Sequence, residues 1–203
     1  MTKQEALISV LGLLVVNVVA RALPHAANFA PVTATGLFLG AYLGRRASFS
    51  LILAILLVSD YALLYVNPFG HVHVGSLYAP WRLWYGNTQI FVYGSFGIPA
   101  LAGSWLRSGR TVTGTAAVAL FCSLQFFFIT NAAVWINGAY DRGVHGLYEA
   151  YVAGIPFFKG TVAGDLFYTM AFFGLFDLAH AQRPRSVLAE QQISPRPKPV
   201  QPD

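Results

Sequence analysis

The segment FCSLQFFFITNAAVWING, residues 121–138, decides the fold class of this chain. It is an apolar, helix-forming run that ends at an Asn-Gly pair, and the polar segment AYDRGVHGLYEAYV, residues 139–152, follows it. The chain becomes apolar again at IPFFKG, residues 155–160, and enters a second hydrophobic run. Two hydrophobic spans therefore enclose a polar loop over residues 137–160. Polar groups in so apolar a setting are costly, and they usually mark a site or a tightly paired contact.

The composition predicts an integral membrane protein. Of the 203 residues, 56% are hydrophobic and only 10% are charged, whereas soluble domains carry roughly 25% charged residues. The single cysteine, Cys122, excludes an internal disulfide, and its position among phenylalanines predicts a buried, unreactive thiol. We expect one all-α transmembrane domain over residues 1–181 and a disordered, proline-rich cytoplasmic tail over residues 182–203.

Hydrophobic runs predict six membrane-spanning helices, at residues 5–22, 31–43, 48–66, 88–106, 114–137 and 161–181. The second run would be only about 20 Å long as a helix. That is short for a hydrocarbon core of about 30 Å, so a re-entrant arm is the alternative. Gly36, Gly40 and Gly44 recur in this run every four residues, which predicts a surface for close helix approach, for movement or for a partner subunit. The first run also resembles a signal peptide cleaved after residues 20–22, although its length favours a retained helix.

The distribution of positive charge predicts the topology. With six spans and a cytoplasmic N-terminus, nine of the 13 Lys and Arg residues lie inside, namely Lys3, Arg45, Arg46, Arg107, Arg110, Arg183, Arg185, Arg196 and Lys198. Four lie outside, namely Arg21, Arg82, Arg142 and Lys159. A re-entrant second run would invert this count, so the positive-inside rule favours six true spans with both termini in the cytoplasm. Most of the histidines and polar aromatic residues then gather on the outer face.

Asp60 is the most costly polar group by position. It lies near the end of the third predicted helix, where a carboxylate opposes the negative end of the helix dipole, so it needs a cationic partner. Arg21, Arg82 and Lys159 are the cations available on that face. A structural ion pair and a ligand-facing carboxylate both remain open. Asp165 is expected near the N-terminus of its helix, where the dipole favours an anion.

Asn131 and Trp135 lie four residues apart and share one face of the fifth predicted helix. They could line an outward cavity, or Asn131 could only join two helices by a hydrogen bond. Asn28 is placed to cap the second helix, although Pro31 fits a slightly later start.

Histidines carry the alternative interpretation. His71 and His73 form an HxH pair that could bind a transition metal together with His145 or Glu149, although the spacing is a weak signal and loop histidines are the simpler interpretation. An enzyme that faces the outer leaflet, or a metal-binding membrane protein, would use these three histidines. The sequence contains no GxSxG, HExxH, Walker or dinucleotide-binding motif. A third interpretation is a non-transporting subunit whose polar loop docks a partner.

Five blocks of sequence carry a family resemblance, namely RALPHAANFAP at 21–31, Ser59-Asp60, FVYG at 91–94, FFFITNAAVW at 126–135, and IPFFKGT at 155–161 with Gly164-Asp165. In this order, between about residues 21 and 173, they resemble a bacterial family of unknown function whose members are described as transport proteins. The six-helix layout is similar to the substrate-binding S-components of energy-coupling-factor vitamin transporters. More loosely, it resembles the solitary cobalamin-uptake proteins called BtuM.

The resemblance implies a transport protein of the bacterial inner membrane, not an enzyme, that captures a small molecule such as a vitamin on the outer side and moves it inward. An energy-coupling membrane subunit with ATPases is an implied partner, and the lipid bilayer is the surroundings; no nucleic acid is expected. In the BtuM group a loop histidine and a helix aspartate help to form the corrinoid pocket, and His25 and Asp60 match them. A corrinoid would be a transported substrate and not a cofactor. Cobalt ligation by a thiolate has no counterpart, because Cys122 lies mid-membrane in a different helix.

The residues expected to bind the ligand are therefore His25, Asn28, Asp60, Tyr93, Asn131, Trp135, Tyr148, Lys159 and Asp165.

Overall fold

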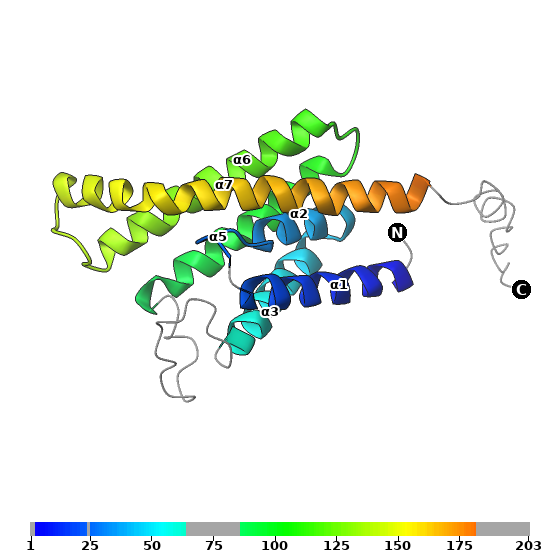
Figure 1. Cartoon of the computed structure of the whole chain (residues 1–203), viewed down its shortest axis with the longest axis horizontal. Helices are drawn as coiled ribbons and strands as arrows, with labels where there is room; N and C mark the ends of the chain where they lie inside the picture. Colours follow the sequence, from blue (N-terminus) through cyan, green and yellow to red (C-terminus); the bar gives the residue numbers. More distant parts are fainter. Residues whose placement is uncertain (1–2, 24, 64–85, 182–203) are drawn as a thin grey trace, which may run out of the picture. The chain divides into compact units, whose positions relative to one another are not determined.

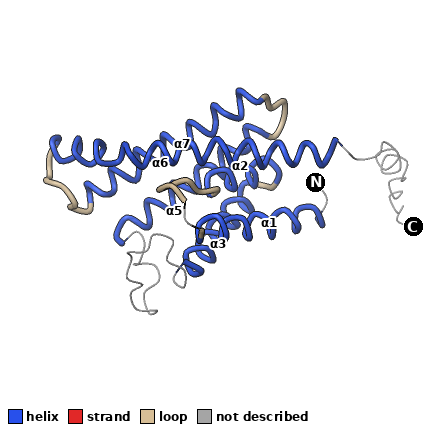
Figure 2. The backbone as a smooth tube through the Cα atoms, in the orientation of Figure 1, coloured by secondary structure: helices blue, strands red, loops and turns tan. Residues whose placement is uncertain are grey.

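A computed structural model describes residues 3–23, 25–63 and 86–181 (Figure 1). These residues form six α-helices and two short 3₁₀ helices, with no strand among them (Figure 2). The all-α class is thereby confirmed. The chain divides into two units, one ending at Phe172 and one beginning at Phe173. Every group discussed below as part of a site lies in the first unit.

Helices α1 (Lys3–Ala22) and α3 (Arg45–Leu63) each bury one narrow face. The buried residues of α1 are Leu13, Asn17 and Arg21, which recur every four residues and therefore share one side of the helix. The rest of α1 exposes large apolar side chains such as Leu7, Leu11 and Val15. An apolar outer surface of this kind suits a lipid environment and not water.

Helix α2 (Val32–Tyr42) is the most buried of the described helices. Every residue from Val32 to Ala41 is buried. It packs closely on α5 (Gln89–Ala102). Gly36 and Gly40 permit this close approach because they have no side chains, and the contact has no room for a Cβ atom at either position. A Cβ on Gly36 would lie 2.9 Å from Pro99 Cβ, and one on Gly40 would collide with the Ala100 carbonyl oxygen. Gly36 and Gly40 thus make, within this chain, the close helix approach that the stripe predicted, whereas Gly44 has no atom within 4 Å of an added Cβ.

Arg107, just after the 3₁₀ helix η2 (Gly103–Leu106), closes the C-terminal end of α2. Its guanidinium donates to the carbonyl oxygens of Gly40 and Leu43, at 3.3 and 2.5 Å, and to that of Ala41 at 3.3 Å. The last carbonyls of a helix lack partners within the helix, and a cation there also complements the helix dipole. A single arginine therefore supplies hydrogen bonds to three carbonyl oxygens at the end of this 11-residue helix.

Helix α6 (Val112–Ile136) begins at Thr111, whose hydroxyl accepts a hydrogen bond from the Gly114 amide at 3.0 Å. Helix α7 runs without interruption from Val144 to Ala181. The prediction of a polar loop over 137–160 and a helix starting at 161 was therefore wrong. The physical reason is a second small-residue stripe, in which Gly146, Ala150 and Gly154 recur every four residues and are all buried. The connection between α6 and α7 is only residues 137–143.

Four helices are long and apolar enough to cross a membrane, namely α1, α3, α6 and α7. In each of them, between 17% and 39% of the most apolar 18-residue window is buried within the protein. The remaining apolar surface is what a bilayer would cover. Helix α2, with 11 residues, and α5, with 14, are shorter than a typical span.

Candidate functional site

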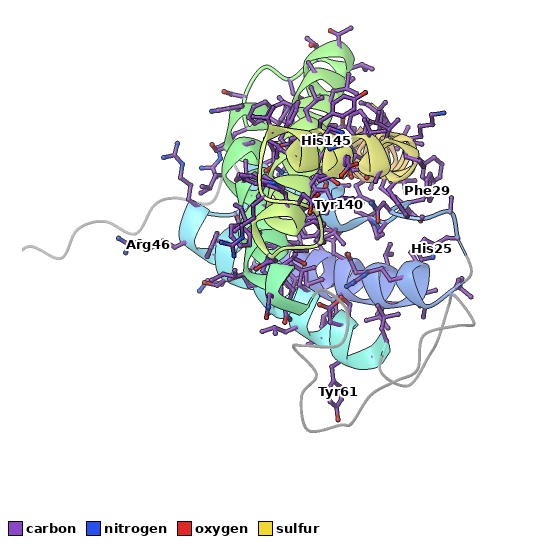
Figure 3. All side chains as sticks on the ribbon, turned by 90° about the vertical axis from the view of Figure 1, so that its left-hand side faces the viewer. His25, Phe29, Arg46, Tyr61, Tyr140 and His145 are labelled. Carbon is purple, nitrogen blue, oxygen red and sulfur yellow. The ribbon has the colours of Figure 1, made fainter. Side chains whose placement is uncertain are left out.

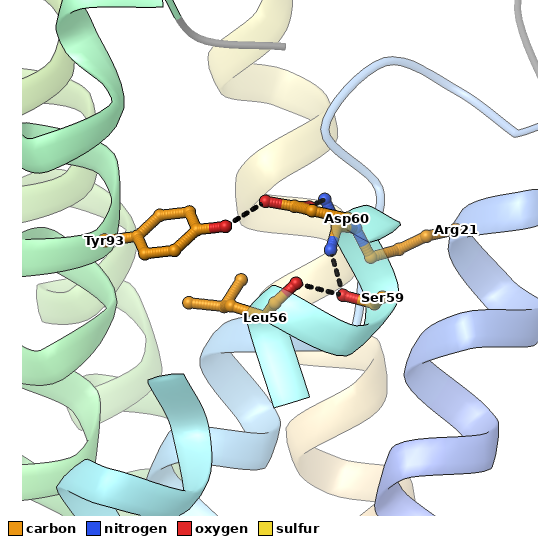
Figure 4. A network of polar contacts seen from close by, with 5 residues as sticks. All are labelled: Arg21, Leu56, Ser59, Asp60 and Tyr93. Atoms are coloured by element: carbon orange, nitrogen blue, oxygen red, sulfur yellow. Dashed lines mark hydrogen bonds and ion pairs between the residues drawn. The ribbon is translucent and has the colours of Figure 1, made fainter. Parts of the chain in front are cut away.

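Arg21 and Asp60 form a buried ion pair where α1 and α3 meet (Figure 4). The side chains of both residues are only 8% exposed. The Arg21 guanidinium also donates to the Ser59 hydroxyl, and the Tyr93 hydroxyl of α5 donates to the second oxygen of Asp60. Ser59 in turn donates to the Leu56 carbonyl at 3.0 Å. The network joins three helices through hydrogen bonds that satisfy both charges.

The local sequence explains why this pair forms. Arg21 occupies the last turn of α1, where the helix dipole favours a cation. Asp60 sits one turn before the described end of α3, where the same dipole disfavours an anion. Pairing the two therefore relieves the cost at Asp60. Of the three candidate cations, Arg21 is the partner; Lys159 is exposed, and Arg82 lies outside the described residues.

A cavity of about 240 Å³ lies beside this pair. Its walls come from α1, α2, α3, α5, α6, α7 and the connection between α1 and α2, through Arg21, His25, Asn28, Ala30, Val32, Thr33, Leu63, Phe96, Phe126, Thr161 and Asp165. Arg21 reaches this wall, whereas Asp60 is not part of it. The Phe96 and Phe126 rings pack with centroids 4.7 Å apart and supply an aromatic surface.

Asp165 is the acidic group in the cavity wall. It is 2% exposed and accepts a hydrogen bond from the Ser123 hydroxyl of α6 at 2.6 Å. Thr33 of α2 also bonds to its carboxyl group. The expectation that the N-terminus of a helix stabilises Asp165 was wrong, because α7 begins at Val144 and places Asp165 in its middle. Side-chain hydroxyls take the place of the dipole.

The connection between α1 and α2 is seated on α7. A Cβ on Gly164 would lie 3.0 Å from the Ala30 nitrogen, and one on Gly160 would collide with the Ala27 carbonyl oxygen. The Phe29 ring packs on Tyr168 with centroids 5.4 Å apart, and Figure 3 shows Phe29 and His25 on this connection. These contacts bring the connection to the edge of the cavity.

Asn28 does not cap α2. Pro31 is the residue that precedes the helix, and no side chain caps it. Asn28 instead takes a left-handed backbone conformation, with φ at 61°, which asparagine tolerates better than most residues. This turn places Asn28 against the cavity.

A second cavity of about 270 Å³ lies between α6 and α7. It contains the predicted ligand residue Asn131, and its lining residues are Asn28, Phe126, Phe127, Thr130, Asn131, Val134, Tyr140, Ala150, Ala153, Gly154, Phe157, Phe158 and Thr161. Asn28, Phe126 and Thr161 line both cavities. The two cavities are therefore neighbours that share a wall.

The remaining predicted ligand residues do not join this site. Tyr148 is 66% exposed, and Lys159 is exposed on the same helix. The Trp135 indole donates to the Asp141 carbonyl at 3.1 Å and so ties the α6–α7 connection to α6. Tyr93 contributes to the ion-pair network and not to the cavity wall. Of the nine predicted residues, His25, Asn28 and Asp165 meet in the first cavity, and Asn28 and Asn131 in the second.

The predicted metal site is only partly within the described residues. His145 is 80% exposed, and its Nδ1 lies 3.5 Å from the Glu149 carboxylate. His71 and His73 lie outside the described residues. In the part of the chain that the structure describes, no group of three His, Cys, Asp or Glu residues is arranged to hold a metal ion.

Sequence reasoning missed the hydroxyl-bearing residues of the site. Thr33, Ser123 and Thr161 are buried, and they contact Asp165 or line the cavity. Serine and threonine are common in membrane helices, where they bond to their own backbone. Ser123 and Thr161 do so, with bonds to Ala119 and Phe157. The sequence therefore could not distinguish them from ordinary helix residues.

Comparison with curated proteins and with solved structures found no match. One family matches over residues 1–188, which is nearly the whole chain, and its description is "Family of unknown function (DUF6580)". This chain, with its apolar helices, its buried Arg–Asp pair and a carboxyl group in the wall of its cavity, therefore belongs to this family.

Proposed function

We propose that this protein is a transport protein of the bacterial inner membrane that binds a small molecule on the outer side and moves it inward. Six passes with both termini in the cytoplasm agree best with the nine-to-four bias of Lys and Arg. Helices α2 and α5 would then cross the membrane as a tightly packed pair. Because both are short, the bilayer around them would have to be locally thinned. Arg107 at the end of α2 would lie on the cytoplasmic side.

The first cavity is the observation that carries the proposal. It combines a cation, Arg21, an acidic group, Asp165, and the aromatic pair of Phe96 and Phe126. Ligand sites are mostly apolar cavities with a few convergent polar groups that fix the orientation of the ligand. This wall suits a small, flat, partly apolar molecule with hydrogen-bonding groups at its ends, as many vitamins are.

The size of the cavity narrows the ligand class. Pockets for drug-sized ligands occupy roughly 300–1,000 Å³, and this cavity has about 240 Å³. A corrinoid is far larger than that volume. The cavity therefore favours a smaller ligand over cobalamin. An energy-coupling subunit with ATPases stays a proposed partner, which rests on the sequence resemblance alone.

The position of the cavity supports entry from the outer side. His25 and Asn28 belong to the connection between α1 and α2 and line the cavity. In the proposed topology this connection lies at the outer ends of both helices. A ligand would therefore meet these two residues first and Asp165 further in.

Mass spectrometry of small molecules that co-purify with the protein tests the proposal. Phe126→Ala removes part of the aromatic wall, and we expect it to lower the retained amount of the specific molecule at least fivefold, about 1 kcal/mol. Phe121→Ala is the matched control, because Phe121 is on the same helix but faces outward and does not line the cavity. Equal retention in the wild type and both variants would refute the cavity as the binding site. Complete absence of a retained molecule, together with no thermal shift in a panel of vitamins, would refute the proposed function.

A further inference from the structure

We propose that Asp165 is a proton-binding site that takes up and releases a proton at the wall of the first cavity. The inference rests on the proposed function, because it supplies the step by which transport would be coupled to protons. It concerns the carboxyl group itself, however, so it can be tested without knowledge of the transported ligand.

The first argument is the lack of a counter-charge. Asp165 is 2% exposed and lies in the middle of a 38-residue apolar helix. The described residues form no ion pair with it, whereas Asp60 is paired with Arg21. An ionised carboxylate in such a place is expensive, and a membrane carboxyl without a cation marks an ion pathway or a proton relay.

The second argument is the geometry at Ser123. Its hydroxyl has one proton and two acceptors, the Asp165 carboxyl at 2.6 Å and the Ala119 carbonyl at 3.2 Å. When Asp165 is ionised, Ser123 donates to the carboxylate. When Asp165 is protonated, its own O–H donates to Ser123, and Ser123 donates to Ala119. Both protonation states thus keep their hydrogen bonds, with only hydroxyl rotation between them.

A third group lies next to this arrangement. Thr169 is four residues after Asp165, so both side chains lie on the same face of α7. Thr169 is fully buried, and its hydroxyl has no hydrogen-bond partner among the described residues. Buried polar groups are rarely left unsatisfied. This face of α7 therefore holds a further donor and acceptor that is available when the proton moves.

Other titratable groups lie at the cavity, and no ion pair between Asp165 and any of them is present among the described residues. Arg21 of α1 is engaged by Asp60, and His25 lies in the same cavity wall. The buried thiol of Cys122 lies on α6, one residue before Ser123. The proton comes from solvent that enters the cavity and returns to it. Its uptake removes the negative charge from the wall, so the affinity for a ligand that donates hydrogen bonds changes with each cycle.

Infrared difference spectroscopy of the full chain in lipid nanodiscs tests the inference. The pH is stepped between about 5 and about 9, a range wide enough for buried carboxyl groups. We expect a C=O band of a protonated carboxyl that disappears reversibly as the pH rises. The band should be absent in Asp165→Asn and unchanged in Asp177→Asn, an exposed carboxyl on the same helix. Identical bands in wild type and Asp165→Asn would overturn the inference.

A second variant keeps the test valid if Asp165→Asn does not fold. Ser123→Ala retains the carboxyl group but removes its donor, and the pH of half-loss of the band should move upward by about 1 unit. No movement would overturn the proposed role of Ser123 and Asp165. Replacement of Na⁺ by choline should leave the band unchanged; a band seen only without Na⁺ would assign the site to Na⁺ instead of the proton.

The outcomes separate this inference from the proposed function. A titrating Asp165 in a protein that retains no small molecule would support the proton site and refute the transport of that class of ligand. A retained molecule in a protein whose Asp165 does not titrate would support the proposed transport function and refute the proton site.

Discussion

Arg21 satisfies the charge of Asp60, and only Arg21 of the two reaches the wall of the first cavity. Asp60 therefore acts mainly through Arg21: it holds the guanidinium in place and neutralises it. This arrangement favours the structural interpretation of Asp60 over direct contact with the ligand. Asp165, for which the described residues supply no ion-pair partner, is the acidic group in the cavity wall.

Breaking the Arg21–Asp60 pair should destabilise the protein strongly. Asp60→Asn leaves a buried guanidinium without its counter-charge, and the loss of one partner of such a pair costs about 3–5 kcal/mol. The combined variant Arg21→Met/Asp60→Leu removes both charges, and we expect it to unfold at a higher temperature than Asp60→Asn alone. Thermal unfolding in detergent measures both. Unchanged melting of Asp60→Asn, together with lost ligand retention, would return Asp60 to the ligand site.

The α1–α2 connection should need a glycine at position 160 in order to pack against α7. In Gly160→Ala the new methyl group meets the Ala27 carbonyl oxygen, and overpacking of this kind costs about 1–3 kcal/mol. Gly12→Ala is the control, because Gly12 is also helical but has open space around it. It should be neutral or stabilising by about 0.5–1 kcal/mol. Equal melting temperatures for the two variants would mean that the connection does not rest on Gly160.

The glycine stripe of α2 should be sensitive at only some of its positions. Gly40→Ala places a methyl group against the Ala100 carbonyl and Gly103, and we expect a loss of about 1–3 kcal/mol. Gly44→Ala, four residues on, meets open space and should change stability by no more than about 0.5 kcal/mol. Thermal unfolding of the two variants side by side measures the difference. If Gly44→Ala were the more damaging change, the stripe would instead contact something outside this chain.

Thiol labelling should locate the connections between helices. Ser108 and Ala139 are exposed residues in the α5–α6 and α6–α7 connections. In a Cys122→Ala background, an impermeant reagent applied to intact cells should label Ala139→Cys but not Ser108→Cys. Cys122 is fully buried, so its replacement should cost little beyond packing and should leave ligand retention within about twofold. Labelling of Ser108→Cys alone would invert the proposed topology.

Much of the helical framework was predictable because its signals are local. The ends of α1, α2 and α6 lie within about two residues of the hydrophobic runs that predicted them, a normal margin for helix boundaries. The first part of α7, residues 144–160, was missed because Tyr148, Glu149 and Lys159 make the segment look polar. A helix with one buried stripe of small residues carries such groups on its exposed side without cost, and Pro156 did not interrupt it.

The sequence by itself determined the all-α class, the apolar helices and one costly carboxyl group, Asp60, because burial in an apolar run can be predicted from neighbouring residues. Asp165 was instead expected at a helix N-terminus, and only the structure placed it in the middle of α7. Only the tertiary structure decided that Arg21 neutralises Asp60, that Ser123 and Thr33 bond to Asp165, and that Tyr148 and Lys159 stay away from the cavity. These outcomes depend on which helix faces meet. Helix packing is set by close contacts such as those of Gly40 and Gly160, which join segments far apart in the chain. Such contacts cannot be predicted from the residues that neighbour each glycine in the sequence.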